Sequence, residues 1–82
     1  MKIKILGSGC ANCHRVRDLA RQVITELAVD DATIQEVTDM KDIVKYPILH
    51  TPGLVIDEKL VCAGRIPSKA EVTTWVTSAL AG

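Results

Sequence analysis

Aromatic residues are almost absent from this 82-residue chain, which contains one Trp, one Tyr and no Phe. Two aromatic side chains are too few to form the stacking platform on which single-stranded nucleic acids bind. An excess of charge of one sign is also absent, because ten basic residues balance ten acidic residues. Since binding to a phosphate backbone depends on a basic surface, we do not expect nucleic acid as a partner.

Long hydrophobic runs are missing as well, although 48% of the residues are hydrophobic. The longest uncharged stretch without Gly or Pro is far shorter than the roughly 20 residues that a membrane-spanning helix needs. Residues 1–6 contain Lys2 and Lys4 and lack the apolar run of a signal peptide. We therefore expect one small domain over residues 1–82, located in the cytoplasm and without a membrane partner.

An even set of cysteines is absent, because the chain has three, and the odd number argues against a structural disulfide framework in a reducing compartment. Cys10 and Cys13 have CxxC spacing between a short apolar strand pattern and a helical pattern. A bridge between them would close so short a loop that it would stabilise the fold by only about 2 kcal/mol. At a helix N-terminus, unpaired backbone N–H groups favour a thiolate, so the motif indicates thiol–disulfide chemistry.

The hydrophobic pattern predicts an α/β protein with the element order β-α-β-α-β-β-α. Strands are expected over residues 2–6, 32–38, 53–56 and 60–63, and helices over residues 13–28 and 39–45. A last helix follows Ser68, which forms a capping box with Glu71. The first helical crossover makes the first two strands parallel, and the residues at 57–59 join the last two strands as an antiparallel hairpin.

The segment Cys10-Ala11-Asn12-Cys13, followed about 40 residues later by Thr51-Pro52 at the opening of a hairpin, resembles the minimal thioredoxin fold. Over essentially its whole length the chain is similar to the thioredoxin-like small redox-active disulfide proteins of bacteria and archaea. The resemblance implies a four-stranded mixed sheet of order 4-3-1-2, with helices one and three on one face and helix two on the other. It also implies that the Thr51–Pro52 peptide bond is cis and lies beside the cysteine pair.

The same resemblance implies a disulfide oxidoreductase that carries electrons without a cofactor. Cys10 is expected to attack a substrate disulfide, and the more protected Cys13 to resolve the mixed disulfide. Thr51 and Pro52 are expected to bind substrate, because a residue without an N–H group leaves the backbone of Thr51 free to pair with a peptide. The expected partners are disulfide-containing protein substrates and a separate disulfide reductase, with the chain itself a monomer.

Some features depart from larger thioredoxins. No Trp precedes Cys10, no Gly-Pro separates the two cysteines, and no buried acid is visible on the corresponding strands. The redox potential and the proton-transfer steps of those proteins are therefore not carried over. Gly7-Ser8-Gly9 instead leaves a small, open approach to Cys10.

Other functions compete for the CxxC motif. A CxxC pair also chelates soft ions such as Cu(I) or Zn(II), although two thiolates leave a zinc site incomplete. With His14 the motif becomes CxxCH, the attachment sequence of c-type haem, which requires export. A glutathione-linked activity and a catalytically silent interaction domain are further alternatives.

The remaining candidate residues each have two interpretations. His14, with Arg15 and Arg17, either adds positive potential near the thiolate or is a solvated helix residue without a role. His50 either borders the substrate groove or is an ordinary loop residue. Cys62 has apolar neighbours and is expected to be a small buried thiol without a catalytic role.

Overall fold

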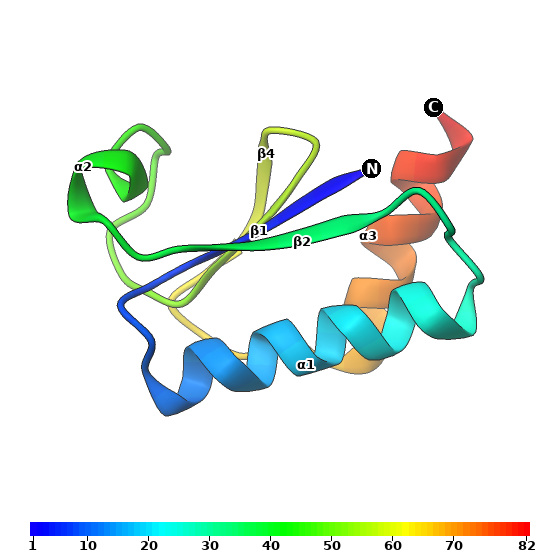
Figure 1. The fold of residues 1–82 in the computed structure, drawn as a ribbon, viewed down its shortest axis with the longest axis horizontal. Helices are drawn as coiled ribbons and strands as arrows, with labels where there is room; N and C mark the ends of the chain where they lie inside the picture. Colours follow the sequence, from blue (N-terminus) through cyan, green and yellow to red (C-terminus); the bar gives the residue numbers. More distant parts are fainter.

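A computed structural model describes all 82 residues and contains the seven expected elements in the expected order (Figure 1). Their bounds are β1 Lys2–Leu6, α1 Ala11–Glu26, β2 Thr33–Val37, α2 Met40–Ile43, β3 Gly53–Ile56, β4 Lys59–Ala63 and α3 Lys69–Ala81. None of these helices combines the length and the hydropathy that crossing a membrane requires.

The four strands form one mixed sheet in the order β2-β1-β3-β4. Strand β1 is parallel to β2 and antiparallel to β3, and β3 is antiparallel to β4. This arrangement is the predicted order 4-3-1-2 read from the opposite edge. The central strands β1 and β3 therefore have neighbours on both sides, and the chain that leaves β1 emerges at the middle of the sheet.

Two apolar clusters fill the two faces of the sheet. Helices α1 and α3 pack against each other over one face, and α2 lies on the other (Figure 1). The larger cluster, under α1 and α3, includes Ile3, Ile5, Cys13, Val16, Val23, Leu54, Ile56, Val72 and Val76. The smaller cluster, under α2, consists of Leu6, Val37, Ile43 and Val55. The predicted distribution of helices over the sheet is confirmed.

Helix α1 begins at Ala11, two residues before the predicted start. Cys10 is its N-cap, with an extended backbone and a sulfur that accepts a hydrogen bond from the Cys13 N–H group at 3.2 Å. The helix also ends before the predicted boundary, because Ala28 has a left-handed backbone with φ of +53°. The apolar periodicity correctly predicted which face of α1 packs against the sheet, whereas the capping contacts determine where the helix begins and ends.

The β3–β4 hairpin turns on Asp57 and Glu58, which both have positive φ values, +48° and +69°. A tight two-residue turn requires positive φ at both positions, and here it is built without glycine. Two hydrogen bonds with Lys2 stabilise Asp57 in this left-handed conformation. Its carboxylate accepts the Lys2 N–H group at 2.8 Å, and its own N–H group donates to the Lys2 carbonyl at 2.8 Å. The tight turn lets β4 begin at Lys59, one residue earlier than predicted.

Tyr46 anchors the loop between α2 and β3. Its hydroxyl accepts a hydrogen bond from Lys4 Nζ at 3.0 Å and donates to Glu58 at 3.1 Å. Lys4 lies on β1 and Glu58 on the hairpin turn, so one side chain ties the loop to two parts of the sheet. This loop carries the chain to Thr51 and Pro52, and its anchoring fixes where those residues lie.

Ahead of α3, Arg65 and Glu71 form a two-pronged ion pair with N–O distances of 2.9 and 2.7 Å. Glu71 also completes the predicted capping box, because its carboxylate accepts the Ser68 N–H group. These hydrogen bonds, chiefly the one from Arg65, lower the pKa of Glu71 from 4.5 to about 2. The folded state therefore binds a proton at Glu71 less readily than the unfolded chain does.

We predict that Glu71→Gln destabilises the protein at pH 7 and weakens the dependence of its stability on acid pH. The ionised carboxylate contributes stability above pH 4.5, and this contribution is lost as the pH falls towards 2. Glutamine keeps one side-chain oxygen for the capping box, and it removes the charge together with the second oxygen that accepts from Arg65. Thermal unfolding between pH 2 and 7 should show the two proteins converging at low pH, whereas Asp30→Asn, at an exposed acid on a loop, should leave the profile unchanged. A constant difference between Glu71→Gln and the parent across this range would contradict the prediction.

Candidate redox site

The cysteine pair lies where β1 passes into α1, and the two sulfurs are joined as a disulfide. Cys10 is exposed, whereas the side chain of Cys13 is only 2% exposed and belongs to the larger apolar cluster. The difference follows from position: Cys10 caps the helix from outside, and Cys13 is in the first turn on the face towards the sheet. Cys10 is therefore the more accessible residue of the pair.

Backbone dipoles at the start of α1 point at Cys10. The Cys13 N–H group donates to the Cys10 sulfur at 3.2 Å, and the His14 N–H group donates to the Cys10 carbonyl at 3.1 Å. The first turn of α1 contains no acidic residue that would oppose a negative charge. In the reduced protein this environment stabilises a thiolate on Cys10.

Gly7, the residue that follows β1, lies next to the disulfide. Its N–H group bonds to the Val37 carbonyl at 3.0 Å, which fixes it to the end of β2. A β-carbon on Gly7 would overlap the Cys13 sulfur and would lie 3.7 Å from the Thr51 β-carbon. Cys13 and Thr51 thus both lie close to the position that a side chain of residue 7 would occupy. Ser8 and Gly9 are exposed, which agrees with the predicted open approach to Cys10.

Thr51 and Pro52 enter β3 beside this contact. The peptide bond between them is cis, Pro52 is buried, and its carbonyl accepts the Gly64 N–H group at 2.9 Å. Thr51 is exposed, and its backbone N–H and carbonyl groups make no hydrogen bond with the rest of the fold. These two backbone groups are therefore available to an incoming strand.

An apolar hollow adjoins Thr51. Its volume is about 380 Å³, and its lining residues are Met40, Ile43, Val44, Ile48, Leu49, His50 and Thr51. None of these residues is an Asp, Glu, Lys or Arg. Met40, Val44 and Leu49 are 63%, 64% and 92% exposed, which is unusual for large apolar side chains. The sequence predicted a short, weakly apolar helix over residues 39–45, but only Ile43 of α2 is buried. Nothing in the sequence pattern predicted that Leu49 would be exposed.

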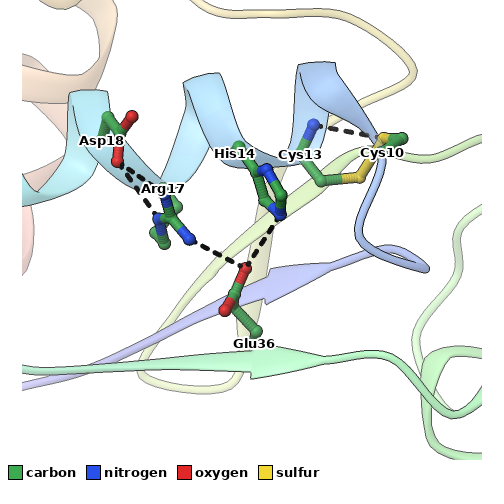
Figure 2. Close-up of polar contacts among 6 residues, drawn as sticks. All are labelled: Cys10, Cys13, His14, Arg17, Asp18 and Glu36. Atoms are coloured by element: carbon green, nitrogen blue, oxygen red, sulfur yellow. Dashed lines mark hydrogen bonds and ion pairs between the residues drawn. A yellow bond between two sulfur atoms is a disulfide. The ribbon is translucent and has the colours of Figure 1, made fainter.

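Polar side chains gather on the β2 side of α1 (Figure 2). His14 Nε2 lies 3.9 Å from a Glu36 carboxylate oxygen, and Arg17 lies 3.5 Å from the same oxygen. Arg17 also donates two hydrogen bonds to Asp18, at 3.1 and 3.0 Å. Sequence analysis identified the cations but missed Glu36, because only the pairing of β1 with β2 brings it opposite the start of α1.

The third cysteine lies apart from this chemistry. Cys62, in β4, is 7% exposed and unpaired, and its burial raises the pKa of its thiol. The expectation of a small buried thiol is confirmed. The protein contains no cluster of three or more His, Cys, Asp or Glu side chains arranged to hold a metal ion.

A mixed four-stranded sheet with three helices and a CxxC disulfide at a strand-to-helix junction defines the thioredoxin-fold class of thiol–disulfide oxidoreductases. The family model of the thioredoxin domain matches residues 1–77, and the chain belongs to this family. It is 39% identical to a thioredoxin of Methanothermobacter thermautotrophicus, a match that covers 88% of this chain and 92% of that protein. It is also 35% identical to a thioredoxin of Methanocaldococcus jannaschii, over 98% of this chain and 91% of that protein. These findings support disulfide oxidoreductase chemistry and do not favour the soft-metal alternative.

We predict that Gly7→Ala destabilises the protein by about 1–3 kcal/mol, because the added methyl group has no room beside the Cys13 sulfur. Ser8→Ala, at the exposed neighbouring position, should change stability by less than about 0.5 kcal/mol. Denaturant unfolding of the two oxidised variants measures both effects. Equal stability of the two variants would show that the contact between Gly7 and Cys13 is not tight.

Proposed function

We propose that residues 1–82 act as one thioredoxin-like domain that reduces disulfides of protein substrates, with Cys10 as the attacking thiol and Cys13 as the resolving thiol. The observation that carries this assignment is the difference in exposure of the two residues, because Cys10 is exposed and Cys13 is only 2% exposed. A separate disulfide reductase returns the oxidised pair to the dithiol. We place this cycle in the cytoplasm, where such reductases keep thiols reduced.

The reaction consists of two exchange steps. The Cys10 thiolate attacks one sulfur of the substrate disulfide, so that a mixed disulfide forms and one substrate thiolate leaves. The Cys13 thiol then loses its proton and attacks the Cys10 sulfur, which releases the second substrate thiolate. Two electrons pass to the substrate, and the Cys10–Cys13 disulfide remains.

The surface around Thr51 supports a polypeptide as the substrate. The free backbone N–H and carbonyl groups of Thr51 suit an extended segment that adds to the edge of the site. The adjoining hollow is mainly apolar and contains no Lys or Arg, which suits a side chain next to the substrate cysteine better than the two carboxylates of glutathione. Leu49, a lining residue that is 92% exposed, is available for contact with such a segment.

We predict that Cys13→Ser opens a substrate disulfide and stalls as a covalent mixed disulfide through Cys10, because no second thiol can displace the substrate. Cys10→Ser should trap nothing, since its remaining site thiol is buried. Non-reducing gels and mass spectrometry of the two variants, each in a Cys62→Ser background, distinguish the outcomes. Equal trapping by both variants would show that the order of attack is wrong.

A second prediction concerns the hollow. Leu49→Ser should lower kcat/KM for a protein disulfide about 3- to 10-fold, because part of the apolar contact with the substrate is lost. The rate with a small aromatic disulfide reagent, which needs only Cys10, should stay unchanged. Leu80→Ser removes an exposed leucine from α3 and serves as the control, with both rates unchanged. An equal loss with both kinds of substrate would contradict a docking role for the hollow.

A further inference from the structure

The interior of the protein contains no buried polar or charged side chain. No internal acid or base can therefore adjust the reactivity of the cysteine pair, and any such control must come from groups at the surface. The charged or titratable groups around the first turns of α1 are His14, Arg15, Arg17 and Asp18 on the helix and Glu36 on β2. His50, on the loop before Thr51, faces the apolar hollow instead.

Histidine is the one residue type in this group whose ordinary pKa lies near neutral pH. His14 directly follows Cys13, and its N–H group bonds to the Cys10 carbonyl, so its backbone is one helical turn from the backbone of Cys10. Side chains on a helix lean towards its N-terminus, which is the end that carries the cysteines. A turn rises about 5.4 Å, so the two backbones are separated by less than the Debye length of about 8 Å at physiological salt.

Glu36 limits where the imidazole can lie. Figure 2 shows the His14 ring extending from α1 towards β2, with the Glu36 carboxylate pointing at it from the strand. The 3.9 Å contact between them becomes an ion pair only when His14 is protonated. Arg17 holds the same carboxylate oxygen at 3.5 Å from the next turn, so Glu36 is fixed by two partners on α1.

We propose that Glu36 is a positioning residue that holds His14 near the cysteine turn, so that protonation of His14 raises the fraction of Cys10 that is present as the reactive thiolate below neutral pH. The proposal rests on the proposed role of Cys10 as the attacking thiol. The protonated imidazole attracts the thiolate, and the neutral imidazole does not. Disulfide exchange by this protein would therefore persist to lower pH than the helix N-terminus alone allows.

The test measures the alkylation rate of Cys10 by a small neutral reagent between pH 5 and 9, in a Cys13→Ser, Cys62→Ser background where only Cys10 reports. We expect His14→Gln to slow alkylation about threefold at pH 6 and to leave the rate at pH 9 unchanged, because the charge is present only at the lower pH. The difference at pH 6 should shrink in 1 M salt, where the Debye length falls to about 3 Å. Loss of packing alone would produce neither the pH dependence nor the salt dependence.

Two controls separate the parts of the proposal. Arg21→Gln removes a cation about two turns further along α1, beyond the Debye length, and should not alter the profile. Glu36→Gln is combined with His14→Gln in a double-mutant cycle, which cancels the direct effect of the lost negative charge on the thiolate. If Glu36 positions His14, the effect of His14→Gln at pH 6 should fall at least twofold when Glu36 is absent.

Either of two results would overturn the proposal. A His14→Gln profile that matches the parent at every pH would show that His14 does not act on Cys10. An effect of His14→Gln that is the same with and without Glu36 would show that Glu36 does not position the imidazole. Both results are independent of the trapping experiment, whose failure would instead disprove the assigned order of attack.

Discussion

The functional part of this fold depends on the absence of a side chain at Gly7, where a β-carbon would overlap the Cys13 sulfur and would lie 3.7 Å from the Thr51 β-carbon. Because this residue has no side chain, the chain leaving β1 can turn into α1 with Cys13 packed against it and with Thr51 close by. The turn between β1 and α1 and the loop before β3, which are distant in sequence, thus meet beside the disulfide. A larger residue would force them apart.

The groups that influence the reactivity of Cys10 are different from the groups that pack the interior of the protein. The larger cluster encloses Cys13 in apolar side chains, and the interior contains no charge. The electrostatic influences on Cys10 come from the backbone N–H groups of α1 and from the side chains along its β2 side. An 82-residue protein cannot readily bury a charged group, because desolvation would cost more than so small a core contributes. Control through surface charge avoids that cost, and it makes the chemistry sensitive to salt.

Local patterns and connections predicted the element order, the parallel first pair of strands and the hairpin correctly, and the resemblance to the thioredoxin family supplied the order of the sheet. Alternating and helical periodicities identified the seven elements, and the crossover between the first two strands required them to be parallel. CxxC and Thr-Pro, in that order along the chain, indicated the thioredoxin family, to which the chain belongs. The limits of α1 and β4 were less accurate, since the Cys10 sulfur cap and the positive φ values of Asp57 and Glu58 have no clear local signal.

What the sequence determined by itself is the order of the elements and the CxxC pair with its more protected second cysteine, because these depend on neighbours along the chain. Tertiary structure alone decided which residues surround that pair. Glu36 meets His14 only because β2 lies beside β1, and Leu49 lines a hollow beside Thr51 only because the loop before β3 folds against α2. Contacts between distant segments depend on how strands and helices stack in space, and no periodicity within one segment contains that information.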